Sequence, residues 1–91
     1  MQSLNVLRNQ IDEIDRQMQE LFLRRMALVT EISDIKPKEA LPITDPDREK
    51  KMFHDRLEPL TGSPFAAYYR RFLECILHES KTWQEERRKH Q

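Results

Sequence analysis

The sequence predicts an all-α protein with three helices per chain, the first of them unusually long. Three observations support this fold class: apolar residues repeat at helical spacing, prolines and one glycine separate the periodic segments, and no segment alternates like a strand. With 91 residues, the chain is expected to form one domain, residues 1–91, near the lower size limit for a self-sufficient core.

The first helix is expected over about residues 3–36. Apolar residues recur three and four positions apart from Leu4 to Ile35, and the first helix-breaking residue is Pro37. Such a helix would be roughly 50 Å long, whereas a compact chain of this size has a diameter of about 25 Å. Part of its apolar stripe must therefore be covered by another chain.

Two further helices are marked by a capping residue followed by proline. Asp45 begins a second helix over about residues 46–58, and Ser63 begins a third over about residues 64–88. The periodicity of the third helix predicts a buried stripe made of Phe65, Tyr69, Phe72, Ile76 and Trp83.

The net charge and the cysteine content limit which binding partners and which cell compartment fit this sequence. Sixteen basic residues balance sixteen acidic ones, so the net charge of zero provides no general attraction to nucleic acid or to an anionic membrane. Cys75 has no partner for an internal disulfide, and we see neither a membrane-spanning apolar run nor a leader at Met1. We therefore expect a cytoplasmic protein without nucleic-acid or membrane partners.

Arg25 interrupts the apolar stripe of the first helix. It occupies the one missing place in the repeat, and no acidic residue lies three or four positions away. An uncompensated buried charge is costly, so such a side chain either reaches water or serves an anionic ligand. Lys36, Ser80 and Gln84 lie on compatible helix faces, which favours an anion pocket inside a helical bundle.

Together these residues resemble the all-helical chorismate mutases. The resemblance covers the chain from Leu7 to about Gln84 and is carried by LR at 7–8, ID at 11–12, Arg25, Lys36, LPITDPDRE at 41–49 and S...Q at 80–84. It implies an intertwined helical homodimer, chorismate as the substrate, and no cofactor or metal. Because members of low activity can depend on docking to another enzyme, it also allows a pathway enzyme as a partner.

The resemblance implies roles for the cations and amides of the pocket. Arg25 and Arg8 of the partner chain would hold the two carboxylates of chorismate, with Ser80 assisting. Lys36 and Gln84 would donate hydrogen bonds to the ether oxygen as its bond to carbon breaks. Since Pro37 directly follows Lys36, the loop at this point departs from the family pattern.

The second helix would bind the ring end of the substrate. By the same resemblance, Glu49 would accept a hydrogen bond from the ring hydroxyl, the Asp45 backbone would lie nearby, and Arg48 would organise this end. The residues with catalytic roles are then Lys36, Gln84, Arg25 and Glu49.

Each candidate residue also has a purely structural interpretation. Arg8 can pair with Asp12 one turn later, and Asp45 can serve as a cap alone. Ser80 can bond a carbonyl of its own helix, and Gln84 can face solvent. Arg48 and Glu49 can be surface charges of a first helical turn, and Lys36 a cation favourable to the helix dipole.

Two alternative functions use the same scaffold. An isochorismate pyruvate lyase-like enzyme shares a similar arginine and lysine set, but Asp45, Glu49 and Ser80 favour the mutase. A non-catalytic helical interaction module is the other alternative. Arg25 argues against it, because a pure coiled coil would be more stable with leucine at that position.

Overall fold

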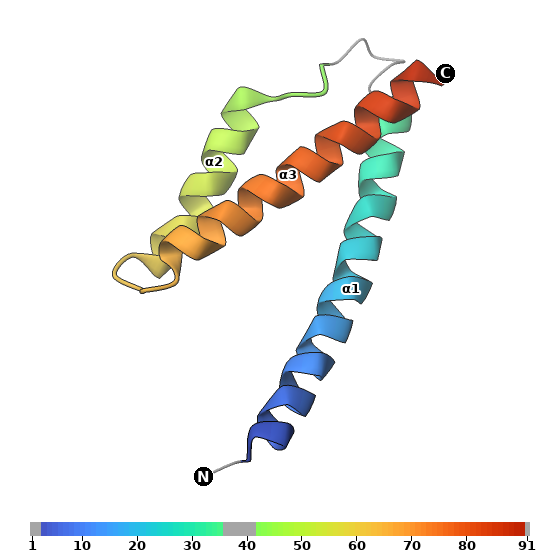
Figure 1. The fold of residues 1–91 in the computed structure, drawn as a ribbon. Helices are drawn as coiled ribbons and strands as arrows, with labels where there is room; N and C mark the ends of the chain where they lie inside the picture. The colour runs from blue at the N-terminus through green and yellow to red at the C-terminus, as the bar shows by residue number, and fades with distance from the viewer. Residues whose placement is uncertain (1–2, 36–41, 91) are drawn as a thin grey trace.

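The computed structural model describes residues 3–35 and 42–90, and these form helices without any strand. In chain order the elements are α1 (Leu4–Ile35), α2 (Pro46–Leu57), a short 3₁₀-helix η1 (Glu58–Leu60) and α3 (Ala66–Lys89). Figure 1 shows α2 and α3 as a hairpin and α1 as a separate long rod. The predicted all-α fold with three helices and a long first helix is confirmed.

The first helix is uninterrupted over 32 residues. Ser3 precedes it and accepts hydrogen bonds from two early amides, from Val6 N to its Oγ at 3.2 Å and from Leu7 N to its carbonyl at 3.1 Å. The side chain thereby satisfies one of the donors left free at a helix start. Lys36 and Pro37, on which the expected end of the helix depends, lie outside the described residues.

Asp45 caps the start of α2. Its Oδ1 accepts a hydrogen bond from Arg48 N at 3.2 Å, and Pro46 takes the first helical position, where its missing N–H leaves no bond unmade. The α-helix ends at Leu57, and the chain continues through η1 around Pro59. The proline therefore converts the last turn to 3₁₀ geometry rather than ending the helical path at once.

The third helix begins at Ala66, two residues later than the sequence suggested. Ser63 does not cap it: its Oγ accepts a hydrogen bond from Phe65 N at 3.1 Å within the preceding turn. Gly62, whose φ of +86° lies in the left-handed region, is the third residue of a turn that Ser63 N closes by bonding the Leu60 carbonyl at 2.8 Å. Ser63 and Pro64 then begin a second turn, in which Ala66 N bonds the Ser63 carbonyl at 3.3 Å. The hydrogen bond to the Ser63 side chain therefore stabilises the turn before α3 and not the first turn of the helix.

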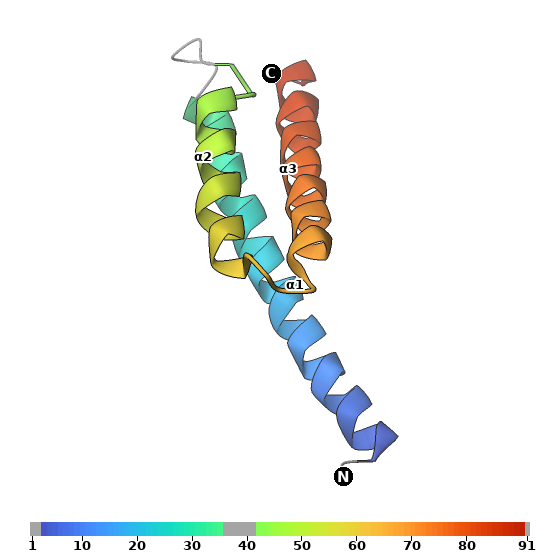
Figure 2. The ribbon, with the colours of Figure 1, turned by 90° about the vertical axis from the view of Figure 1, so that its left-hand side faces the viewer.

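α1 and α3 meet near their C-terminal ends and separate toward their N-terminal ends, whereas α2 packs against α3. α1 and α3 run in the same direction, because Arg25 contacts Ser80, Thr30 contacts Trp83, and Asp34 contacts Arg87. Figure 2 shows the N-terminal half of α1 extending well beyond the α2–α3 hairpin. The Cα extents are 56 × 29 × 15 Å and the radius of gyration is 16.8 Å, against about 12 Å for a compact chain of this length.

Apolar burial within the single chain is small. Among the described residues, only Val29 and Leu73 are buried apolar side chains. Within the single chain the predicted stripe of α3 is only partly buried, since Phe65 is 69% exposed and Phe72 is 43% exposed. The whole repeat of α1 is exposed as well: Leu4, Leu7, Ile11, Ile14, Met18, Leu21, Leu28, Ile32 and Ile35.

An apolar cleft of about 900 Å³ separates α1 from α3 below their junction. It is lined by Met18, Phe22 and Arg25 on one side and by Tyr69, Phe72 and Ile76 on the other. Together with the exposed repeat of α1, the cleft forms an apolar surface rimmed by polar residues, which is typical of an interaction site. Within the described residues, no helix combines the length and apolarity needed to cross a membrane.

Gly62 allows a direct test of the turn between η1 and α3. Gly62→Ala should lower the free energy of unfolding by about 1 kcal/mol, because an alanine Cβ disfavours positive φ. The space around the position is open, so steric contact with other residues does not contribute. Asparagine tolerates this conformation, so Gly62→Asn should lower the free energy of unfolding by less than Gly62→Ala does, as measured by urea denaturation. Equal stability of the wild type and both variants would contradict the interpretation.

Candidate active site

A polar cluster lies where α1 and α3 meet, and we define it by Arg25, Ser80 and Gln84. Arg25 Nη1 donates a hydrogen bond to Ser80 Oγ, which itself donates to the Ile76 carbonyl at 2.9 Å. Gln84 Nε2 lies 3.4 Å from the Ser80 carbonyl, a weak bond. Ser80 and Gln84 are both buried, so the interpretation of Gln84 as a solvent-facing residue is wrong.

Arg25 is partly desolvated without an acidic partner. Burial lowers the pKa of its guanidinium, and the positive charges of Arg56 and Arg48 lower it further. Among the described residues, no carboxylate lies within ion-pair distance of Arg25. Since an arginine in a protein stays protonated, the site concentrates positive charge.

Unpaired polar atoms accompany this charge. Gln84 Oε1 and Ser33 Oγ are both buried and have no hydrogen-bond partner. A buried polar atom without a partner costs about 1–3 kcal/mol, and such atoms in native proteins usually mark a bound water or a functional site. Gln84 therefore has a free acceptor, Oε1. Its donor, Nε2, makes only a weak bond to the Ser80 carbonyl and can readily bond another acceptor instead.

The start of α2 brings further charges toward the cluster. Asp45 is a helix cap, as its structural interpretation predicted, and Arg48 is exposed next to it. Glu49 is half-buried and accepts a salt bridge from Lys81 Nζ on α3 at 2.5 Å. Glu49 is therefore not a simple surface charge, because it ties α2 to α3 one residue from Ser80.

Arg8 lies far from the cluster of its own chain. It is exposed on the N-terminal half of α1, the part that projects beyond the hairpin in Figure 2. Seventeen residues of helix separate it from Arg25, a distance of about 25 Å. The structure records no ion pair between Arg8 and Asp12. Lys36, the remaining candidate, lies outside the described residues.

Two cations near the cluster are absent from the residues singled out in the sequence. Arg56 stands eight residues after Arg48 and so shares its face of α2, a spacing that can be read directly. Lys81 follows Ser80, but its partner Glu49 lies on another helix. Only the packing of α2 against α3 reveals that pair.

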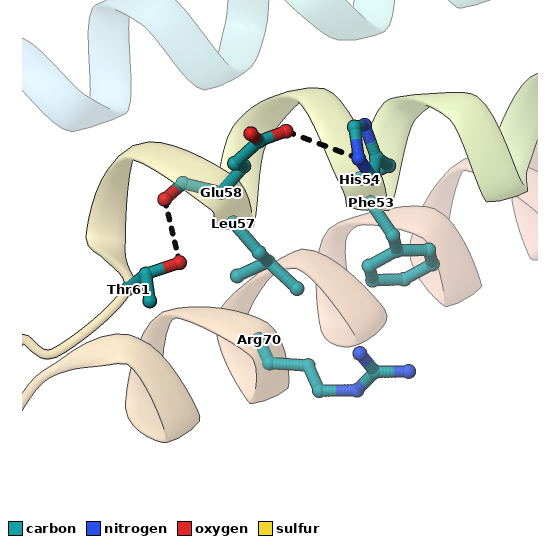
Figure 3. A pocket seen from close by; sticks show the side chains of 6 residues that line it. All are labelled: Phe53, His54, Leu57, Glu58, Thr61 and Arg70. Atoms are coloured by element: carbon teal, nitrogen blue, oxygen red, sulfur yellow. Dashed lines mark hydrogen bonds and ion pairs between the residues drawn. The ribbon is translucent and has the colours of Figure 1, made fainter.

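A second, smaller hollow of about 340 Å³ lies between α2, η1 and α3, away from the cluster (Figure 3). In it His54 Nε2 lies 3.0 Å from Glu58 Oε2, and the Arg70 guanidinium stacks over Phe53 at 5.1 Å. Its charged groups are exposed and already have partners, since His54 pairs with Glu58 and Arg70 pairs with Glu74 outside the hollow. Within the described residues, no group of three His, Cys, Asp or Glu side chains is placed to hold a metal ion.

Comparison with known proteins identifies the family. A family model described as chorismate mutase type II matches residues 7–85. The chain belongs to the chorismate mutase type II family. All eight candidate site residues, from Arg8 to Gln84, fall within the matched range.

Curated relatives of this chorismate mutase type II chain include both short and long proteins. It is 37% identical over 60 residues to a protein of Methanocaldococcus jannaschii named chorismate mutase, covering 66% of this chain and 60% of that protein. It is 39% identical over 56 residues to a T-protein of Haemophilus influenzae, covering 62% of this chain and 15% of the relative.

A bifunctional chorismate mutase/prephenate dehydratase of Aquifex aeolicus is 42% identical over 53 residues, which cover 58% of this chain and 15% of the relative. The matched regions thus span between about one seventh and three fifths of the length of these relatives. No solved structure gives a significant match.

The uncompensated charge of Arg25 predicts an unusual gain in stability. Arg25→Leu should raise the free energy of unfolding by about 0.5–1 kcal/mol, a modest figure because solvent screens the partly exposed guanidinium. Ser80 keeps its bond to the Ile76 carbonyl, so no donor is left unpaired. The exposed neighbour Arg24 provides the control: Arg24→Leu should give no such gain in thermal unfolding. A less stable Arg25→Leu protein would show that Arg25 is structural.

Proposed function

We propose that this protein converts chorismate to prephenate by an intramolecular Claisen rearrangement, in phenylalanine and tyrosine biosynthesis. One observation carries the proposal: in a chain of the chorismate mutase type II family, Arg25 is half-buried, fixed by Ser80 and surrounded by other cations, with no carboxylate pairing with it in the described part of the chain. A dianionic substrate provides the missing negative charge.

The carboxylates of the substrate are bound by arginines. Arg25 forms a bidentate pair with one carboxylate, and Ser80, which already contacts the guanidinium, assists. Arg8 of a second chain binds the other carboxylate. Holding both ends of the flexible ether keeps it in the compact chair that the rearrangement needs, which removes much of the entropy barrier.

Charge stabilisation at the ether oxygen supplies the rest of the acceleration. Gln84 turns its Nε2 from the Ser80 carbonyl to the ether oxygen, which gains negative charge as its bond to carbon breaks. Lys36 donates to the same oxygen. Each preorganised donor is worth on the order of 3 kcal/mol, and a millionfold acceleration needs about 8 kcal/mol.

The ring end of the substrate lies against the start of α2. Glu49 accepts a hydrogen bond from the ring hydroxyl, with the Asp45 backbone close to it, and Arg48 organises this end. The rearrangement breaks and forms bonds within a single molecule. It therefore needs no nucleophile, metal or cofactor from the protein.

A second copy of the chain completes the site by forming an intertwined homodimer. The exposed apolar repeat of α1 and the cleft between α1 and α3 fit the α1 helix of another subunit. In that arrangement the projecting N-terminal half of α1 carries Arg8 into the partner's pocket. The lone Cys75, which has no disulfide partner in the chain, supports a location in the reducing cytoplasm.

The activity is tested by following the loss of chorismate absorbance with purified protein. Prephenate should be the product, and Arg25→Ala should lower kcat/KM by about a hundredfold or more, because a buried charge of the substrate loses its partner. Isochorismate is assayed in parallel, because the alternative lyase would act on isochorismate and the mutase on chorismate. Release of hydroxybenzoate and pyruvate, or no turnover of either substrate by a folded protein, would refute the proposal.

The shared site is tested by mixing two inactive variants. If Arg8 acts in the partner's pocket, a refolded equal mixture of Arg8→Ala and Arg25→Ala should regain about a quarter of wild-type activity, since each mixed dimer contains one intact site. If both arginines act within one chain, the mixture stays inactive. Light scattering on both variants provides the control, and the measured mass should be about twice the 11.1 kDa of one chain.

A further inference from the structure

The salt bridge between Lys81 and Glu49 has no part in the function proposed so far. It joins α3 to α2 with 2.5 Å between Nζ and Oε1, and the two side chains are 31% and 22% exposed. The pair between Lys51 and Asp55, within α2, has side chains that are 79% and 52% exposed. The Lys81–Glu49 pair is therefore shielded from solvent to a degree that an ordinary surface pair is not.

The position of Lys81 connects this salt bridge with the polar cluster. Lys81 directly follows Ser80, the acceptor of Arg25, and precedes Gln84 by about one helical turn. Its ammonium reaches across to Glu49, next to Arg48 in the first turn of α2. The pair thus lies along the side of the site where α2 faces α3.

The two oxygens of the Glu49 carboxylate have different surroundings. Lys81 contacts Oε1 of Glu49, whereas Oε2 has no recorded hydrogen bond to any described residue. A half-buried carboxylate without a cation would lose solvation and its fixed orientation. With Lys81 in place, the group is held as an acceptor with one oxygen still available.

We propose that Lys81 is a positioning residue that fixes the Glu49 carboxylate so that its free oxygen accepts the ring hydroxyl of the substrate. The inference rests on the proposed function, because it assumes that Glu49 receives this hydroxyl. Lys81 acts through Glu49 and does not touch the reacting atoms. It thereby determines how strongly the site selects a substrate with a hydroxyl at this ring position.

The test compares Lys81→Met with Lys81→Arg on chorismate. The hydroxyl contact exists in both the ground state and the transition state, so Lys81→Met should raise KM about tenfold and change kcat by less than about twofold. Lys81→Arg keeps the cation and should restore most of the lost affinity. Lys51→Met, which removes the exposed pair within α2, is the matched control and should leave both constants unchanged.

A substrate analogue in which hydrogen replaces the ring hydroxyl separates positioning from a general structural role. Lys81→Met should reduce kcat/KM for chorismate but not for the analogue, and it should have no further effect in a Glu49→Gln background. A protein that is only misfolded or loosened would lose activity on both substrates. If Lys81→Met does not fold, Lys81→Gln, which keeps a polar end, takes its place.

The outcomes distinguish this inference from the proposed function. A wild-type protein that turns over chorismate, with unchanged or improved KM in Lys81→Met, would overturn the role of Lys81 alone. Equal losses on chorismate and on the analogue would also overturn it. A folded wild-type protein without any mutase activity would overturn both the proposed function and the role of Lys81.

Discussion

The polar character of the junction between α1 and α3 depends on the contact between Arg25 and Ser80, which holds a guanidinium where the apolar repeat of α1 would otherwise continue. Burial and two neighbouring arginines oppose the charge there, and no carboxylate in the described part of the chain offsets it. The junction is accordingly polar, with Gln84 and Ser33 where an ordinary bundle would place leucine. Helix packing optimised for stability alone would not retain this arrangement.

The fold could be predicted because its determinants are local. Apolar spacing, the cap at Asp45 and the prolines each act within a few residues, and they gave the three helices. The start of α3 was misplaced because Ser63 has the same local features whether it caps a helix or closes a turn. Within one chain the buried face of α3 was predicted only in part, because apolar residues three and four positions apart cover two adjacent faces of a helix. Leu73 is buried within the chain, whereas Phe72 lines the cleft between α1 and α3.

The candidate site could be predicted only where helical spacing determines which residues share a face. Arg25 stands out because it breaks a regular repeat, and the α3 polar residues lie one turn apart, so their convergence follows from periodicity. Lys81 could not be found in this way, because its importance comes from Glu49 on a helix 32 positions earlier in the sequence. The family resemblance supplied Arg8, because no contact recorded between Arg8 and the described residues of its own chain reveals a role.

The scarcity of buried apolar residues has a consequence for how the chain folds. With only Val29 and Leu73 buried in the described part, one subunit removes too little apolar surface from water to offset the entropy of ordering its helices. In the proposed homodimer, the second chain that covers α1 would supply the missing free energy, so folding and association would be a single step. The apparent stability of such a dimer would follow mass action, so that dilution would shift the population toward unfolded chains and the proposed activity would be lost below a threshold concentration.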